Sequence, residues 1–166
     1  MPLADTLLRL AVGPRLFLPK WTHQTMAEIT RNLHENFGLT AEQAAYRESE
    51  IRKHFGEAWV EGYEDLILAM TNQEKDRHVL AAAVRSGAET IVTYNLRDFP
   101  RSALASYSIT AQGPSTFLKN LYELDSDAVL HTLEQQAAAI DKSFDYLLDR
   151  LRVNVPGFVH TLTQQK

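Results

Sequence analysis

The chain has 166 residues, of which 45% are apolar, and it carries a formal net charge of -4 with no cysteine. This length and composition suffice for one domain with a hydrophobic core. The lack of cysteine excludes disulfides and thiolate zinc sites, so oxygen or imidazole ligands must hold any metal. The negative charge argues against a protein that holds nucleic acid chiefly through a large cationic surface.

The sequence shows neither a secretory signal pattern at its N-terminus nor a membrane-spanning segment. No apolar run approaches the ~20 residues of a membrane span. The N-terminus lacks a basic region followed by an uninterrupted apolar run, which a secretory signal requires. We therefore expect a cytoplasmic protein with no membrane partner.

The first 55 residues predict three helices and one short strand. A helix is expected over residues 3–11, because Gly13 and Pro14 end its pattern. The apolar run 15–21 suits a strand, and Thr22 can cap the helix that follows. That second helix ends at Gly38. Its predicted inner face consists of Met26, Ile29, Leu33 and Phe37. The third helix has a capping box at Thr40 and Gln43 and apolar anchors at Ile51 and Phe55.

From residue 56 onwards, short alternating elements precede long helices. Residues 56–70 are ambiguous, and we expect a strand and then a short helix there. A helix opened by Asp76 should run to residue 86, with strands over 90–94 and 108–111 and a helix over 114–122. The C-terminal helices carry two apolar stripes, formed by Leu130, Leu133, Ala137 and Ile140 and by Phe144, Leu147, Leu148 and Leu151. A short last helix follows Pro156. The sequence thus predicts an α/β fold with an αβα core over residues 1–122 and a helical extension over 123–166 packed on that core.

Two acids flank the predicted unit formed by the helix 76–86 and the strand 90–94. Asp76 stands at a helix start, where aspartate stabilises the helix without any ligand. Asp98 lies in the turn sequence NLRDFP, where acids are also common. A helix start and the end of a parallel strand can meet at one edge of an α/β sheet, where such folds bind ligands. Together the two carboxylates therefore suit a hard divalent cation about as well as they suit a purely structural role.

Glu28 is a third candidate. It lies roughly 140° from the centre of the apolar stripe of its helix, so it points away from the core. A solvated surface glutamate and a carboxylate that faces a wet cleft both give this pattern. The histidines His23, His34 and His78 do not form a zinc-binding spacing, and we expect them to be exposed or half-buried. Motifs of serine hydrolases, nucleoside triphosphatases and dinucleotide-binding domains do not occur.

The segments TMAEITRNL, DRHVLAAAV and ETIVTYNLRDFP, in this order, resemble the PIN-domain ribonucleases. They are most similar to the toxins of bacterial virulence-associated toxin-antitoxin systems. The similarity spans most of residues 3–122 and is most specific from Asp76 to Pro100. It implies a three-layer αβα fold with a short, mostly parallel central sheet. The helices after Tyr122 resemble the C-terminal extension of one branch of the family.

This resemblance also implies a function and a set of site residues. The family uses a cluster of acids to hold Mg²⁺ or Mn²⁺ for hydrolysis of single-stranded RNA. Its acids match Glu28, Asp76 and Asp98 here, and Asn95 matches the polar position before the last of them. The resemblance implies a cognate antitoxin protein as partner. A homodimer is one arrangement that the C-terminal helices could form.

One part of the family pattern is missing. The family begins with an apolar strand that ends in an aspartate, and the match to this sequence starts after that strand. Asp5 is not a substitute, because LADTLLRLA matches the first helix of the family. We expect either a reading frame that starts upstream of Met1 or a fold that compensates by rearrangement or oligomerisation. If the chain starts at Met1, metal binding should be weakened and activity can be lost.

Three hypotheses follow. The first is a metal-dependent endoribonuclease, the toxin of a toxin-antitoxin pair, in which Arg31 and Arg77 are candidates for contacts with the RNA backbone. The second is a PIN-like module that has lost catalysis and acts through an antitoxin, RNA or self-association. The third is an α/β domain whose acids only cap helices and form turns. Cation-dependent cleavage of RNA distinguishes the first from the others.

Overall fold

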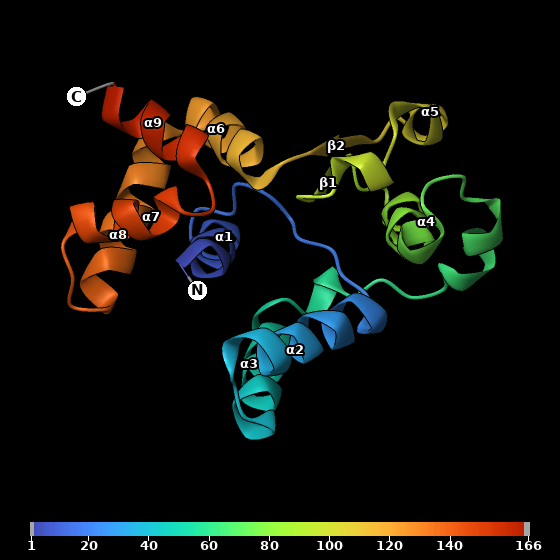
Figure 1. The fold of residues 1–166 in the computed structure, drawn as a ribbon, viewed down its shortest axis with the longest axis horizontal. Helices are drawn as coiled ribbons and strands as arrows, with labels where there is room; N and C mark the ends of the chain where they lie inside the picture. Colours follow the sequence, from blue (N-terminus) through green and yellow to red (C-terminus); the bar gives the residue numbers. More distant parts are fainter. Residues whose placement is uncertain (1, 165–166) are drawn as a thin grey trace. The chain divides into compact units, whose positions relative to one another are not determined.

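The computed structural model describes residues 2–164 and is mainly helical, with one small sheet (Figure 1). Within this part of the chain, the side chains of Asn36 and Phe37 are not described, so the predicted inner position of Phe37 lies outside the described residues. None of the described helices combines the length and apolar character that a membrane span requires.

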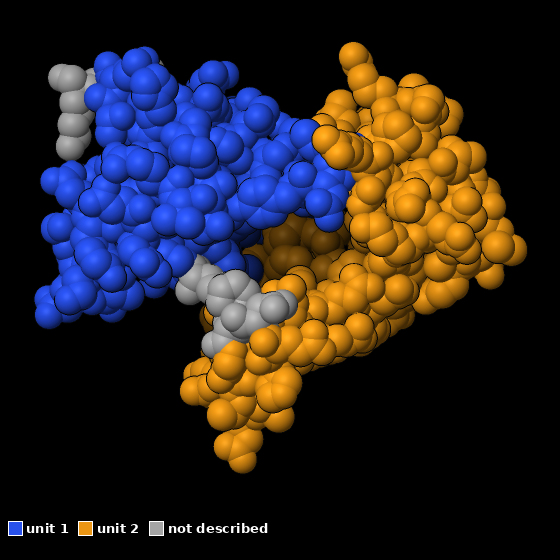
Figure 2. Space-filling view, in the orientation of Figure 1, with its two compact units in different colours: residues 1–18, 92–96, 112–166 blue, residues 19–91, 97–111 orange. Residues whose placement is uncertain are grey.

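The chain divides into two compact units, which Figure 2 colours separately. Unit 1 comprises residues 1–18, 92–96 and 112–166, and unit 2 comprises residues 19–91 and 97–111. These units interleave along the sequence, because the chain passes between them several times. The predicted boundary between residues 122 and 123 divides the chain differently and stays a prediction.

Unit 1 is a group of helices around one apolar core (Figure 1, blue α1 and orange to red α6–α9). Its helices are α1 (Pro2–Val12), α6 (Pro114–Leu124), α7 (Ser126–Ala139), α8 (Phe144–Arg152) and α9 (Pro156–Gln164). The fully buried side chains include Leu10, Leu118, Leu133, Leu147, Leu151 and Phe158. The helices after residue 122 therefore pack on α1 and α6.

The second apolar stripe of the C-terminal helices is confirmed, but the first is only partly right. Leu133 and Ala137 are buried, whereas Ile140 is 48% exposed. The reason is local, because α7 ends at Ala139 and the helical periodicity does not reach Ile140. Gln136 is buried on the same helix and is held by a 2.7 Å hydrogen bond from Thr6 of α1.

Unit 2 begins with two capped helices, α2 (His23–Phe37) and α3 (Ala41–His54). Thr22 and Thr40 cap them through capping boxes, as the sequence predicts. Gly38 ends α2 in the left-handed region at φ 66°, where glycine has no steric penalty. The predicted inner face of α2 is wrong at Ile29, which is 44% exposed, while Met26 and Leu33 are buried.

Two of the predicted strands are not formed as expected. Residues 15–21 do not form a strand, and their only β pairing is an isolated parallel bridge between Trp21 and Trp59. The Val60 N–H donates to the Trp21 carbonyl at 2.9 Å in this bridge. Residues 56–70 form 3-10 turns at Gly56–Ala58 and Glu64–Ala69 around the bridge.

The sheet consists of β1 (Thr90–Val92) and β2 (Thr110–Gln112), which run parallel. The Thr110 N–H donates to the Glu89 carbonyl, and the Thr93 N–H donates to the Gln112 carbonyl, so the two strands advance in the same direction. The second strand begins later than predicted, because Ser108 adopts a left-handed turn conformation at φ 57°. The predicted short parallel sheet is confirmed, and the structure is compatible with the predicted α/β class.

Helix α4 (Arg77–Ser86) precedes β1 and packs in the core of unit 2. Leu80, Ala81, Ala82 and Ala83 are buried in succession, so the helix is covered around most of its circumference. Alanine has no side chain beyond Cβ, which allows neighbouring backbone to approach closely from several directions. The short helix α5 (Arg101–Leu104) follows the turn that carries Asp98.

Candidate metal site

Asp76 and Asp98 lie on either side of one lysine. The ammonium nitrogen of Lys75 lies 2.7 Å from Asp98 Oδ2 and 3.5 Å from Asp76 Oδ2. Local structure brings these residues together, since the Gln73 N–H donates to the Asp98 carbonyl at 3.1 Å. The residue after Asp98, Phe99, is buried in the apolar core of unit 2 and anchors the turn. The structure therefore brings together two of the three acids predicted for the site.

The capping explanation for Asp76 is wrong. Asp76 occupies the N-cap position of α4, yet its side chain makes no capping hydrogen bond. The carboxylate oxygen Oδ2 is buried and has no hydrogen-bond partner within the described structure. By contrast, Asp125 at the start of α7 accepts a hydrogen bond from the Ala128 N–H at 2.9 Å. A structural role at the helix start therefore does not account for the carboxylate of Asp76.

The two carboxyls differ in their electrostatics. Burial raises the pKa of Asp76, and Asp98 raises it further by hydrogen bonding to the protonated form. The hydrogen bond from the Lys75 ammonium lowers the pKa of Asp98. When both acids are ionised, neither can donate to the other, which leaves Asp76 Oδ2 without a donor. The negative charge of Asp98 is therefore well compensated by Lys75, whereas that of Asp76 is poorly compensated.

Such a pair suits a small divalent cation. Carboxylate oxygens are the ligands that Mg²⁺ and Mn²⁺ prefer, and Mg²⁺ usually needs only one or two of them in addition to waters. Asp76 Oδ2 offers a buried lone pair that accepts no hydrogen bond within the described structure and lies 3.5 Å from the Lys75 ammonium. The same place already attracts a positive charge, that of Lys75. The residues present thus fit the metal that the family resemblance implies.

Glu28 lies against His78 instead of against the two aspartates. Its Oε1 is 3.4 Å from His78 Nε2. Glu28 is exposed, as predicted, whereas His78 is buried, which corrects the expectation that it is exposed or half-buried. Within residues 2–164, no group of three or more His, Asp or Glu side chains is arranged to hold one metal. A ligand role for Glu28 stays a prediction.

Asn95 belongs to unit 1, while the three acids belong to unit 2. Its backbone N–H donates to Thr93 Oγ1 at 3.0 Å, and its side chain is exposed. A role for Asn95 in the site therefore also stays a prediction. Of the arginines considered for RNA contacts, Arg77 donates from Nε to the Asn72 carbonyl at 3.4 Å, and Arg31 is exposed.

Two residues near the acids were not anticipated. Lys75 is the first, although its place next to Asp76 in the sequence offered a signal for an ion pair. Asn72 is the second, because it is buried and both polar atoms of its side-chain amide lack a partner in the described structure. Its sequence context, in a polar stretch before α4, gives no indication of burial.

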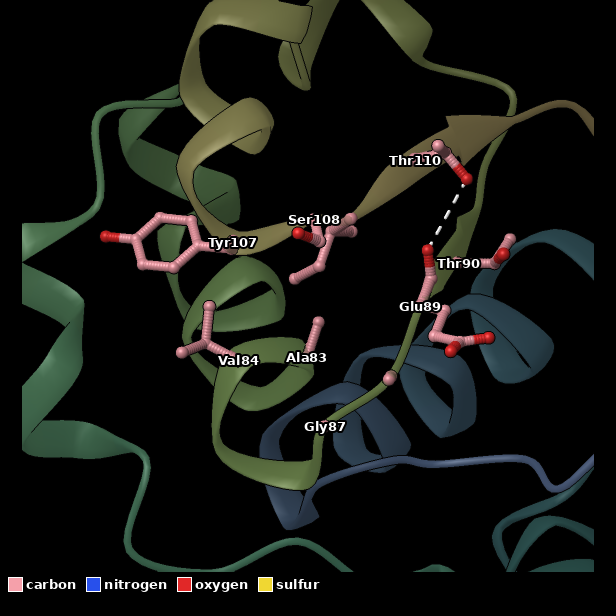
Figure 3. Close-up of a pocket in the computed structure, with 10 residues that line it drawn as sticks. Ala83, Val84, Gly87, Glu89, Thr90, Tyr107, Ser108 and Thr110 are labelled. Atoms are coloured by element: carbon pink, nitrogen blue, oxygen red, sulfur yellow. Dashed lines mark hydrogen bonds between the residues drawn. The ribbon is translucent and has the colours of Figure 1, made fainter.

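A separate hollow of about 400 Å³ lies at the other end of α4 (Figure 3). Its lining comes from the end of α4 at Val84 and Gly87, from Glu89 and Thr90 at the start of β1, and from Tyr107 before β2. Neither Asp76 nor Asp98 lines it. Because α4 spans about 15 Å, the hollow and the acid pair are distinct features of unit 2.

Comparison with known proteins supports the family resemblance. No family model matches the chain, and no solved structure matches it. A protein of Mycobacterium tuberculosis named "Putative ribonuclease VapC50" is 51% identical over 106 residues. Over these residues, this chain is similar to a VapC protein. The predicted resemblance to the virulence-associated toxins is thereby confirmed. The match covers 61% of this chain and 62% of the length of the VapC relative.

Proposed function

We propose that this protein is a metal-dependent endoribonuclease that hydrolyses phosphodiester bonds of single-stranded RNA. We further propose that it acts as the toxin of a toxin-antitoxin pair, and that its fold is PIN-like. The observation that carries the proposal is the carboxylate of Asp76, which is partly buried beside Asp98 and caps no helix. The name of the VapC relative supports RNA as the substrate class.

Asp76 and Asp98 would hold the metal, which we propose to be Mg²⁺ or Mn²⁺. The chemistry that such an ion supplies is polarisation of a phosphate and a lowered pKa of bound water. Asp98 is anchored by the backbone bond to Gln73 and by the buried Phe99, so its position is set before a ligand arrives. Asp76 is fixed by the turn before α4, in which its own N–H donates to the Gln73 carbonyl at 2.9 Å. Preorganised carboxylates of this kind lose little conformational entropy on binding a cation.

Glu28 has a more distant role in this proposal. It would complete the negative charge of the site from α2, either directly or through a water that it shares with His78. The 3.4 Å approach of Glu28 to His78, two residues after Asp76, supports that placement. Asn95 would orient a water or a phosphate oxygen, and Arg77 would contact the RNA backbone.

The test is cleavage of a single-stranded RNA by the purified chain with Mg²⁺ or Mn²⁺, and again with EDTA. Asp76→Asn should abolish cleavage because it removes a charged ligand while it preserves the size of the side chain. Asp5→Asn is the matched control, since Asp5 is a partly exposed acid that pairs with Arg9 at 2.9 Å on α1. Asp5→Asn should cleave as the unmodified chain does. Retained cleavage in Asp76→Asn would overturn the assignment.

The second candidate is a PIN-like module without catalytic activity, which acts through an antitoxin, RNA or self-association. Within residues 2–164, no group of three or more His, Asp or Glu side chains is arranged to hold one metal, which favours this candidate. This candidate predicts no cation-dependent turnover together with formation of a specific complex. A gel-filtration experiment with the chain alone and with a co-expressed antitoxin would reveal such complexes.

A further inference from the structure

The side chain of Lys75 connects the two acids of the proposed metal site. Its ammonium nitrogen contacts Oδ2 of Asp98 at 2.7 Å and Oδ2 of Asp76 at 3.5 Å. These are the oxygen atoms that a divalent cation would need. An ammonium and a divalent ion cannot occupy the same space between two carboxylates, and their like charges repel each other there.

We propose that Lys75 is an internal competitor for the divalent cation, which must displace its ammonium from Asp76 and Asp98 before it can bind. This inference rests on the proposed function, because it assigns the metal to these two carboxylates. It concerns a residue that neither the family resemblance nor the sequence motifs assign to the site.

The three side chains differ in how easily they can move. The Lys75 side chain is 61% exposed, whereas those of Asp76 and Asp98 are 24% and 20% exposed. A lysine has four rotatable side-chain bonds, and its ammonium is strongly hydrated in water. The lysine can therefore leave towards solvent while the carboxylates stay in place. No rearrangement of the backbone is needed for the exchange.

Lys75 stabilises the two acids unequally when no metal is bound. The short contact is with Asp98, and the hydrogen bond from Lys75 lowers the pKa of that acid. Asp76 receives only the longer contact, and its Oδ2 lacks a hydrogen-bond donor. One monovalent ammonium therefore compensates the pair incompletely. A divalent ion can bind both oxygens at once, which gives it an advantage over the lysine that a monovalent ion does not have.

The size of the effect follows from the ion pairs that are lost. Exposed ion pairs contribute little to stability, so displacing two of them should weaken metal binding by roughly three- to thirtyfold. Lys75→Met keeps the length and the apolar stem of the side chain and removes the charge. This variant should therefore bind Mn²⁺ roughly three- to thirtyfold more tightly than the unmodified chain. Lys75→Arg keeps the competing charge and should bind no more tightly than the unmodified chain.

Isothermal titration of the full chain with Mn²⁺ tests the proposal. Lys53→Met is the matched control, because Lys53 is also an exposed lysine of unit 2 with a carboxylate partner, Glu50, at 3.0 Å. It should leave the Mn²⁺ affinity unchanged. Far-ultraviolet circular dichroism of each variant verifies that it is folded. The proposal is overturned if Lys75→Met binds Mn²⁺ as tightly as the unmodified chain does, or less tightly.

A second measurement follows the lysine directly and needs no variant. In a ¹³C-labelled chain, titration with diamagnetic Mg²⁺ should shift the Cε and Hε signals of Lys75 as its ammonium leaves the carboxylates, while those of Lys53 stay constant. Saturable binding of Mg²⁺ without a Lys75 shift would overturn the role of Lys75 and leave the metal site intact. No site-specific binding in any variant, Lys75→Met included, would overturn the metal site and with it the competition.

Discussion

Asp76→Ala separates a structural role of this residue from a metal-binding one through thermal stability. The side chain of Asp76 caps nothing, so its removal should change the stability of the metal-free chain by no more than about 0.5 kcal/mol. Mn²⁺ at one hundred times its dissociation constant should add about 2.7 kcal/mol to the stability of the unmodified chain. For a chain of this size, each kcal/mol corresponds to roughly 2–4 °C in Tm, so the Mn²⁺-induced rise should be about 5–11 °C. Asp76→Ala should lose this rise.

The assay can be confined to the relevant unit. The sequence has two tryptophans, Trp21 and Trp59, and both belong to unit 2 together with Asp76. Thermal unfolding followed by tryptophan fluorescence, with Mn²⁺ and with EDTA, therefore reports on the unit that contains the site. Thr40→Ala is the control, because Thr40 is a true cap in the same unit and accepts from the Gln43 N–H at 3.2 Å.

The control and the test variant should behave in opposite ways. Thr40→Ala should cost about 1 kcal/mol, or roughly 2–4 °C, equally with and without Mn²⁺. Asp76→Ala should differ from the unmodified chain only when Mn²⁺ is present. If Asp76→Ala instead behaves like Thr40→Ala and keeps the full Mn²⁺-induced rise, Asp76 is a structural residue and the metal assignment is refuted.

Three further predictions concern the same unit. Glu28→Ala should weaken Mn²⁺ binding by less than tenfold, and by less than Asp76→Ala does, because the contact that Glu28 makes is with His78. Calorimetric titration measures both affinities, and an equal loss of affinity in the two variants would contradict this prediction. Burial raises the pKa of Asp76 above its usual value of 3.8, so protons should compete with Mn²⁺ for this carboxylate already at a pH above 3.8. If the Mn²⁺ affinity stays constant on acidification down to pH 3.8, Asp76 is not a metal ligand. Asp98, whose pKa Lys75 lowers, should remain ionised to lower pH. Leu80 is fully buried on α4, so Leu80→Ala should lower the free energy of unfolding by about 2–5 kcal/mol, as measured by urea unfolding followed by tryptophan fluorescence. A decrease below about 1 kcal/mol would show that neighbouring side chains fill the space that Leu80 leaves.

The features that sequence predicts well here are those that neighbouring residues determine. The caps at Thr22 and Thr40 and the helix end at Gly38 are confirmed, because each depends on hydrogen bonds or backbone angles within a few residues. Strands are predicted less well, since pairing depends on partners far along the chain. Residues 15–21 have strand-like composition, but Trp21 finds only a single bridge partner in Trp59.

Burial was predicted correctly only where the helical period extends through the whole packed face. Helical periodicity predicts burial wrongly at Ile140, because α7 ends one residue earlier. It also predicts burial wrongly at Ile29, which unit 2 leaves exposed to solvent on α2. It fails in the opposite sense at His78, which is buried on α4. Several successive positions of that helix are covered, so its inner face is wider than a single stripe predicts.

Asp76 and Asp98 were equivalent candidates in the sequence, and only tertiary structure makes them different. A lysine side chain that reaches Asp98 compensates its charge, while packing before α4 removes water from Asp76 without supplying a donor. Neither effect has a sequence signature, because desolvation depends on what surrounds a carboxyl in space. An aspartate that occupies a cap position without capping contributes nothing to the helix. A bound cation would supply the partner that Asp76 Oδ2 lacks, so the proposed function explains the feature of Asp76 that helix capping leaves unexplained.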